Sequence, residues 1–296
     1  MKIGFVGLGA MGRPMAMSLQ RAGHDLQVHD LRRVEGFANF KASITEAAKD
    51  CELLFTSLPG PAEVAAVASQ IESSLKGGAA WFDLSTNSPS AVRRVHAQLS
   101  KISFLDAPVS GGPTGAQSGK LAIWVGGDAG VFKKYQPVLR QIGDQPYYVG
   151  PIGAGSVAKL AHNCASFTIQ AALAEVFTLG VKAGVEPLAL LRAVRQGATG
   201  RKRTFDRLPE YFLRGVYDPP AFTVRLAHKD MTLALQLAAE EKVPMKIGQL
   251  ALDELDEAMQ RGWSERDCRV AMTLQEERAK VSVRVPPEQL KNALDG

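Results

Sequence analysis

The sequence predicts an α/β protein in two parts, an N-terminal domain built on a doubly wound parallel sheet and an all-helical C-terminal domain. Strand-like and helix-like runs alternate as far as about residue 150, which is the pattern of βαβ units. A run of about 27 residues without proline follows, and its apolar side chains have helical spacing. We therefore predict domains at residues 1–151 and 152–296, the second beginning with this long interdomain helix.

The first strand and helix enclose a glycine-rich turn. A β-branched and aromatic run at residues 2–6 leads directly into Gly7-Leu-Gly-Ala-Met-Gly12, and helical spacing then continues to Gly23. Between a strand and a helix, this G-x-G-x-x-G pattern is typical of a Rossmann dinucleotide-binding turn, where phosphates meet the helix N-terminus. Gly7 makes the tight turn, Gly9 lets a pyrophosphate approach the backbone, and Gly12 packs helix against strand. The predicted cofactor contacts are Gly7, Leu8, Gly9, Ala10, Met11 and Gly12.

The second strand, at residues 25–29, is followed by a carboxylate that bears on the choice of cofactor. Asp30 comes 18 positions after Gly12, where an acid accepts hydrogen bonds from the adenosine ribose hydroxyls and repels a 2′-phosphate. This favours NAD. Arg32 and Arg33 follow at once, and either guanidinium could bind a 2′-phosphate, so NADP remains the alternative.

Further strands are predicted at residues 52–58, 80–84, 103–107, 121–126 and 146–149, with helices at 61–75, 89–99 and 129–140. Ligands of such sheets bind at the carboxyl ends of the strands. The segments there are Pro59-Gly-Pro61, Ser85-Thr-Asn87 and Pro108-Val-Ser-Gly-Gly112. In the last one, the Ser110 hydroxyl and the unobstructed N–H groups of Gly111 and Gly112 suit a carboxylate.

The long helix is predicted at residues 156–182, a length of roughly 40 Å at 1.5 Å per residue. Lys159 and Asn163 lie four residues apart, so they project from one face on successive turns. A lysine near the start of an apolar helix opposes the helix dipole and is partly desolvated, which together predict a lowered pKa and an acid/base role. The alternative is that Lys159 extends its charge to water and Asn163 binds a nearby loop.

Composition limits the possible partners. The net charge of +5, from 35 basic and 30 acidic residues, is scattered, and only 7% of residues are aromatic. This favours small anionic ligands over nucleic acid. No apolar run approaches the length that crosses a membrane, and no signal-peptide cleavage site follows the N-terminal run, so a cytoplasmic protein is expected. The three widely spaced cysteines predict neither a disulfide framework nor a metal site.

The second half is predicted to be helical at residues 187–195, 205–213, 226–241, 247–261 and 265–280. Amphipathic helices without enough partners of their own predict packing against a second copy, hence a homodimer or homotetramer. The basic run Arg201-Lys-Arg203 is of a kind that is usually solvated. Our hypothesis is that Arg201 or a neighbour reaches the far end of the substrate and selects a second anionic group.

Four signatures in order make the chain resemble the β-hydroxyacid dehydrogenase family, which includes 3-hydroxyisobutyrate dehydrogenase, from Lys2 to about Val283. They are Phe5-Val-Gly-Leu-Gly-Ala-Met-Gly-Arg-Pro-Met15, Asp106-Ala-Pro-Val-Ser-Gly-Gly112, Gly153-Ala-Gly-Ser-Val-Ala-Lys159-Leu-Ala-His-Asn163 and His228-Lys229-Asp230. The resemblance implies hydride transfer between a nicotinamide cofactor and a small β-hydroxyacid or acid semialdehyde. It also implies an N-terminal Rossmann domain, a long shared helix and a helical C-terminal domain.

The resemblance also assigns roles by position. It implies that Lys159 is the catalytic proton donor and acceptor and that Asn163 holds the substrate beside it. The implied substrate contacts are Ser110, Gly111, Gly112, Thr86, Phe222 and Asp230, and the implied cofactor contacts are Leu58, Pro59, Thr86 and Lys229. Gly60-Pro61 departs from the usual asparagine-containing turn. The family often has paired asparagines after the lysine, whereas here His162 precedes Asn163 and Cys164 follows it.

The substrate remains open at this point. Tartronate semialdehyde, succinic semialdehyde, glyoxylate and sulfolactaldehyde are alternatives within the same chemistry. A non-catalytic nucleotide-binding protein would be expected to lack Lys159, Asn163 or Ser110, and an imine reductase generally lacks the lysine, whereas this chain keeps all three residues.

Overall fold

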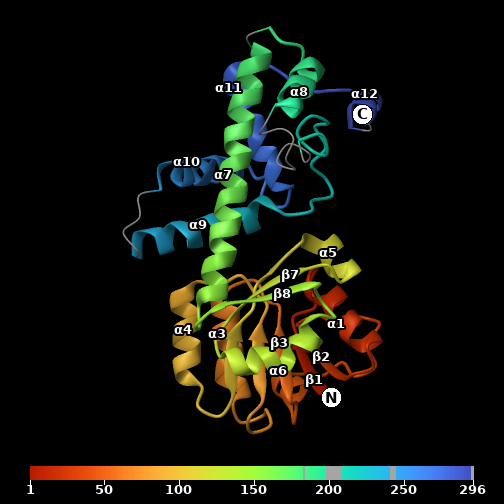
Figure 1. Ribbon diagram of the computed structural model, residues 1–296, viewed down its shortest axis with the longest axis vertical. Helices are drawn as coiled ribbons and strands as arrows, with labels where there is room; N and C mark the ends of the chain where they lie inside the picture. Colours follow the sequence, from red (N-terminus) through yellow and green to blue (C-terminus); the bar gives the residue numbers. More distant parts are fainter. Residues whose placement is uncertain (183, 198–207, 241–244, 295–296) are drawn as a thin grey trace. The chain divides into compact units, whose positions relative to one another are not determined.

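The computed structural model describes residues 1–182, 184–197, 208–240 and 245–294 (Figure 1). The chain forms two compact units, Met1–Ala161 and His162–Gly296, which divide within one continuous helix. The predicted domain boundary after residue 151 stays a prediction. Among the described residues, none of the helices combines the length and the apolar character that crossing a membrane requires.

The first unit is built on a sheet whose first five strands are parallel, as predicted. They are β1 (Lys2–Val6), β2 (Asp25–His29), β3 (Leu53–Thr56), β4 (Ala80–Asp83) and β5 (Ser103–Asp106), in the spatial order β2-β1-β3-β4-β5. The chain leaves β1 toward β2 on one side, whereas β3 lies on the other. This reversal beside β1 is the topological switch point at which doubly wound sheets bind ligands.

The far edge of the sheet differs from the expectation of purely parallel strands. Strand β6 (Val109–Ser110) continues the line of β5, and β7 (Ala122–Gly126) returns antiparallel to both, while β8 (Gln145–Gly150) is parallel to β7. The connection from β6 to β7 holds only the short helix α5 (Gly112–Ser118). A connection of this length reverses the chain instead of making the crossover that a parallel strand requires.

Helices cover both faces of this sheet. Helices α1 (Gly12–Arg21), α5 and α6 (Ala129–Leu139) contribute to one apolar core, and α2 (Ile44–Ala48), α3 (Pro61–Ile71) and α4 (Pro89–Gln98) to the other. Strand side chains alternate between them, so that Phe55 and Phe82 enter the first core and Leu54 and Trp81 the second. This two-sided burial explains why the strands are nearly continuous apolar runs.

The second unit is helical. Helix α7 (Ala154–Lys182) enters it from the first unit, and α8 (Pro187–Gln196), α9 (Val224–Glu240), α10 (Lys246–Gln260), the 3-10 helix η2 (Cys268–Met272), α11 (Thr273–Ala279) and α12 (Pro287–Leu294) follow (Figure 1). Its core joins α7, α8 and α12 through buried apolar side chains, including Phe177, Leu191 and Leu290.

Two predicted helices of this unit are wrong. Within the predicted helix at 205–213, the described residues 208–213 form turns, since the Leu213 N–H bonds to the Leu208 carbonyl oxygen, five residues back (3.0 Å), and not four back as in an α-helix. The predicted helix at 265–280 begins only at Cys268 and is divided into η2 and α11. The residue before it, Asp267, forms a β-bridge with Thr223, which holds that part of the backbone extended.

One row of residues crosses the sheet at its carboxyl edge. Thr56, Asp83 and Asp106 occupy the same register on β3, β4 and β5. Asp83 is fully buried, and its Oδ1 accepts hydrogen bonds from the Thr56 hydroxyl (2.8 Å) and the Ser85 N–H (3.2 Å). Removal from water penalises the ionised carboxylate, and burial therefore raises the pKa of Asp83.

Replacing this carboxyl should change how stability depends on pH. A carboxyl whose pKa is higher in the folded state contributes stability below its unfolded pKa of about 3.9, and loses it as the pH rises through the folded value. Asp83→Asn does not titrate. We therefore expect the free energy of unfolding of the wild type, relative to that of the variant, to fall between pH 4 and pH 8, by at most about 1.4 kcal/mol per pH unit.

Urea unfolding at several pH values measures this difference. Asp144→Asn is the control, because that carboxylate is exposed. A difference in the free energy of unfolding between wild type and Asp83→Asn that stays constant with pH would contradict the raised pKa of Asp83.

Candidate active site

The glycine turn has two closed positions and one open one. Gly7 has a φ of +92°, and a Cβ on it would lie 2.2 Å from the Ser57 carbonyl oxygen. A Cβ on Gly12 would lie 1.9 Å from the Gly7 carbonyl oxygen, so helix α1 starts in direct contact with the turn. Gly9 is exposed, and a Cβ there would meet nothing within 4 Å. The backbone at Gly9 is thus open to close approach from outside.

The carboxylate of Asp30 is fixed beside this turn. Its Oδ2 accepts a hydrogen bond from the Leu8 N–H at 2.6 Å, and its Oδ1 accepts one from the Arg32 N–H at 3.1 Å. The Arg33 guanidinium lies 5.8 Å from the centre of the Phe40 ring. The two amide donors hold the Asp30 carboxylate in a fixed orientation at the end of β2.

The ends of β3 and β4 are joined by a similar contact. The Leu58 N–H donates to the Ser85 hydroxyl at 2.8 Å, which links the two predicted cofactor segments. Thr86 and Leu58 are half-buried, whereas Pro59 is exposed. The structure therefore brings the glycine turn, Asp30, Leu58-Pro59 and Thr86 to the carboxyl ends of neighbouring parallel strands.

The segment at Ser110 lies where β6 passes into α5. Gly111 and Gly112 have φ values of +136° and +62°, which side chains other than glycine rarely adopt. Both glycines are exposed, and Ser110 is half-buried. The backbone here turns sharply and leaves two successive glycine amides without covering side chains.

Helix α7 is anchored to the sheet by one buried carboxylate. Asp106, at the end of β5, accepts the Gly153 N–H on Oδ1 (2.7 Å) and the Ser156 N–H on Oδ2 (2.6 Å). Burial raises the pKa of Asp106, and the two backbone donors oppose that rise. A Cβ at Gly155 would lie 2.2 Å from the Trp124 carbonyl oxygen, so only glycine permits this approach of helix to strand.

Lys159 follows this anchor by one helical turn, and only 9% of its surface is exposed. It therefore does not extend its charge freely into water, as the alternative interpretation of the sequence required. Asn163, one turn further along α7, is also buried. The two side chains lie on successive turns of the same helix, as predicted from their spacing.

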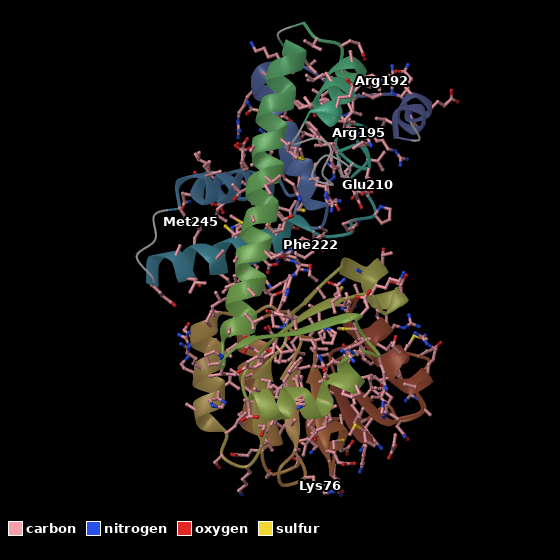
Figure 2. All side chains as sticks on the ribbon, in the orientation of Figure 1. Lys76, Arg192, Arg195, Glu210, Phe222 and Met245 are labelled. Carbon is pink, nitrogen blue, oxygen red and sulfur yellow. The ribbon has the colours of Figure 1, made fainter. Side chains whose placement is uncertain are left out.

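The remaining predicted residues form a group in the helical unit. The Asn163 amide donates to Asp230 Oδ2, and the Lys229 ammonium lies 3.0 Å from Asp230 Oδ1. The ring of Phe222, labelled beside α7 in Figure 2, stacks on Phe167 with a centroid distance of 5.8 Å and an interplanar angle of 17°. Arg201, the last predicted substrate contact, lies outside the described residues.

Comparison with known proteins gives matches over both halves of the chain. Residues 2–150 match the model of the NAD-binding domain of 6-phosphogluconate dehydrogenase, and residues 153–274 match that of the NAD-binding domain of NADP-dependent 3-hydroxyisobutyrate dehydrogenase. The chain is 34% identical to 2-(hydroxymethyl)glutarate dehydrogenase of Eubacterium barkeri, covering 95% of this chain and 97% of that protein. The chain belongs to the 3-hydroxyisobutyrate dehydrogenase family.

Other relatives agree with this family. Identity to the 3-hydroxyisobutyrate dehydrogenase of Pseudomonas aeruginosa is 34%, over 84% of this chain and 89% of that enzyme. The fold matches the Mycobacterium tuberculosis 3-hydroxyisobutyrate dehydrogenase, solved with L-serine, with a TM-score of 0.83 and 27% identity over 92% of this chain and 98% of that one. The protein is thus an NAD(P)-dependent oxidoreductase of the hydroxyacid dehydrogenases, which act on CH–OH groups.

The glycine turn fits the dinucleotide that this 3-hydroxyisobutyrate dehydrogenase family binds. The open space at Gly9 admits a pyrophosphate against the backbone. Gly7 and Gly12 instead pack directly against neighbouring backbone and have no such space. The Asp30 carboxylate faces the same turn. No group of three or more metal-ligating side chains occurs among the residues that the structure describes.

Sequence reasoning did not single out two residues that organise the site of this family member. In the sequence, Asp106 stands out only as part of a signature, and Ser85 only as the end of a strand. A charged residue closing the apolar run at 103–107 is a signal for Asp106, since a buried carboxylate requires donors from elsewhere. Nothing local in the sequence identifies Gly153 and Ser156 as those donors.

Asp106→Asn should weaken the attachment of α7. An asparagine replaces one acceptor oxygen by an NH₂ group that faces a backbone N–H, and hydrogen bonds to charged groups contribute about 1.5–3 kcal/mol each. We expect the free energy of unfolding to fall by about 2–3 kcal/mol, measured by urea denaturation at pH 7. The control is Asp128→Asn, an exposed aspartate whose carboxylate caps α6 at the Val131 N–H. Asparagine caps a helix as well as aspartate does, so Asp128→Asn should lose little stability. Equal losses of unfolding free energy in both variants would contradict the role of Asp106 in holding the start of α7.

Proposed function

We propose that this protein is an NAD-dependent dehydrogenase of small β-hydroxyacids, with Lys159 as the acid/base group. The observation that carries the proposal is the buried Lys159 on the first turns of α7, a helix whose start is fixed by Asp106 to the carboxyl edge of the sheet. Ligands of doubly wound sheets bind at that edge. A lysine held there and removed from water is suited to proton transfer.

A nicotinamide cofactor held by the glycine turn and Asp30 would supply the hydride chemistry, as acceptor from the carbinol carbon in oxidation and as donor to it in reduction. In oxidation, the neutral Lys159 amine takes the hydroxyl proton of the β-hydroxyacid as the C–O bond becomes a carbonyl. In reduction, the Lys159 ammonium gives that proton to the carbonyl oxygen. The proton and the hydride together account for the two hydrogens that the substrate loses or gains.

The substrate carboxylate is proposed to bind at Ser110, Gly111 and Gly112. The positive φ values of the two glycines and their exposed backbone support this, because successive uncovered amides form an anion-binding concavity. Asn163 orients the substrate beside Lys159, and its contact with Asp230 fixes the amide. Phe222 is proposed to line the substrate site, and Thr86 to contact substrate and cofactor.

The names of the relatives suggest a substrate class. 3-Hydroxyisobutyrate, 2-(hydroxymethyl)glutarate and L-serine share a 3-hydroxypropionate unit and differ in the group on its second carbon. We propose that this protein acts on a 2-substituted 3-hydroxypropionate. Tartronate semialdehyde, succinic semialdehyde, glyoxylate and sulfolactaldehyde are the alternatives, and a panel assayed in both directions distinguishes them. A homodimer or homotetramer stays our prediction for the assembly.

NAD is proposed as the preferred cofactor, with NADP as the alternative. The Asp30 carboxylate is held by two backbone amides. In this position it would accept hydrogen bonds from the adenosine ribose hydroxyls and repel a 2′-phosphate. Arg33 lies over Phe40, which leaves the exposed Arg32 as the described arginine next to Asp30 that could pair with such a phosphate. Gly7–Gly12, Leu58, Pro59 and Lys229 are proposed as the further cofactor contacts.

Lys159→Ala should lower kcat for hydroxyacid oxidation by about 10²- to 10⁴-fold, because that is the usual contribution of a positioned proton-transfer group. NADH binding, measured by fluorescence titration, should be retained. Lys133→Ala, which removes an exposed lysine on α6, is the control and should keep wild-type turnover. Near-normal turnover of Lys159→Ala would exclude the acid/base role.

Asp30→Ala should lower kcat/KM for NAD by about 10-fold or more, since it removes hydrogen bonds to a charged group. The ratio of kcat/KM for NAD over NADP, which should exceed one in the wild type, should fall in the variant. Glu35→Ala, an exposed acid shortly after Asp30, should leave both values unchanged. A wild-type enzyme that prefers NADP would overturn the assignment of NAD.

A further inference from the structure

A second buried carboxylate organises the helical unit. Asp267 is fully buried, and it precedes η2. Its Oδ2 accepts hydrogen bonds from the backbone N–H groups of Ala221 (3.0 Å) and Phe222 (3.4 Å), which lie 45 or more positions away in the sequence. Its Oδ1 accepts the Arg269 N–H at 3.1 Å. The carboxylate thus holds two segments together.

Backbone hydrogen bonds between residues 217–223 and residues 267–268 add to these contacts, and we call the whole set the clamp. The Asp267 N–H donates to the Tyr217 carbonyl oxygen at 3.0 Å, and the Cys268 N–H donates to the Phe222 carbonyl oxygen at 2.8 Å. Thr223 and Asp267 form an antiparallel bridge. The segment from Tyr217 to Thr223 is therefore bound along its length by the residues around Asp267.

Arg269 compensates the buried charge. Its guanidinium lies 3.2 Å from Asp267 Oδ1 and 3.7 Å from the centre of the Tyr211 ring, and only 6% of the residue is exposed. An isolated carboxylate at this depth would be strongly unfavourable, whereas a paired and hydrogen-bonded one is tolerated. The Arg269 guanidinium thus pairs with the same carboxylate that accepts both amides.

The clamped segment leads into proposed site residues. Phe222 presents its ring to Phe167, which lies one helical turn after Asn163 on α7. Thr223 accepts the Leu226 N–H on its hydroxyl (3.3 Å) at the start of α9. That helix carries Lys229 and Asp230, and Asp230 receives the Asn163 amide.

We infer that Asp267, balanced by Arg269, is a positioning residue for substrate binding, acting through Phe222 and the start of α9. The inference rests on the proposed function for the roles of Phe222, Asn163 and Asp230. Asp267 itself bonds the backbone and Arg269, and its effect is to fix where the Phe222 ring and the first turn of α9 lie. Loss of the clamp changes how firmly the hydroxyacid is held, while proton transfer at Lys159 remains.

Asp267→Asn tests this with little change in shape. The asparagine can place a donor NH₂ group where Oδ2 now accepts two amides. We expect KM for the hydroxyacid to rise at least tenfold while kcat falls less than threefold, the pattern of lost uniform binding. An unchanged KM in a folded variant overturns the inference.

Arg266→Ala is the matched control. The Arg266 side chain also pairs with the clamped segment, through Asp218 at 3.2 Å, but it is partly exposed and donates nothing to residues 221–222. Removing it should leave KM within twofold. If Arg266→Ala raises KM as much as Asp267→Asn does, any disturbance of this loop suffices and the specific role of Asp267 is wrong.

Amide hydrogen exchange gives a result that does not depend on activity. Peptides that contain the amides of residues 221–222 should exchange at least tenfold faster in Asp267→Asn than in the wild type, and at the wild-type rate in Arg266→Ala. Unchanged exchange overturns the clamp. Faster exchange with unchanged KM retains the clamp and overturns its role in substrate binding.

The same measurements separate this inference from the proposed function. If the wild type oxidises no hydroxyacid in the panel, the proposed function fails, and exchange still reports on the clamp. Phe222→Leu should raise KM and keep the wild-type exchange rate, because it removes the ring and keeps the backbone. Should Asp267→Asn fail to fold, Arg269→Lys keeps the charge and loses the planar contact with Tyr211, and is expected to shift KM and exchange in the same direction.

Discussion

The architecture of the first unit depends on the pair of hydrogen bonds from the α7 N-terminus to Asp106. Without them, the orphan amides of a 29-residue helix would meet a buried sheet edge, which is unfavourable for backbone donors. The carboxylate satisfies two of these donors and complements the helix dipole. Gly155 then allows the helix backbone to approach Trp124. Lys159 is placed by this attachment, since a helix fixed at its start fixes the side chains of its next turn.

Buried aspartates perform related tasks at three places in this chain. Asp83 connects the ends of β3 and β4 through Thr56 and Ser85, Asp106 connects β5 to α7, and Asp267 connects η2 to the segment before α9. In each case the carboxyl group accepts hydrogen bonds from polar groups, mostly backbone N–H groups, that apolar packing alone does not orient. Hydrophobic burial stabilises without direction, whereas these bonds fix orientation. Because proposed site residues need a fixed orientation, buried polar residues lie next to them.

The helical unit holds several of the residues proposed to bind substrate or cofactor. Asn163, Asp230 and Lys229 form a connected polar group, and the stacked rings of Phe167 and Phe222 lie next to it along α7. Because α7 is continuous, Lys159 and Asn163 keep a fixed separation of one turn whatever loops surround them. Family membership agrees with this pairing of a nucleotide-binding unit and a helical one.

The sequence alone determined the parallel strands to within two residues, the glycine turn, the long helix and the spacing of Lys159 and Asn163, because these follow from local periodicity and chain sterics. It did not determine the antiparallel return of β7, the turns at 208–213 or the division of the helix predicted at 265–280. Those features were decided by tertiary contacts, as when Asp267 bridges to Thr223 and prevents a continuous helix. The backbone donors Gly153 and Ser156 of Asp106, and Ala221 and Phe222 of Asp267, lie 45 or more residues away from these carboxylates. No local pattern can specify a hydrogen bond across that separation.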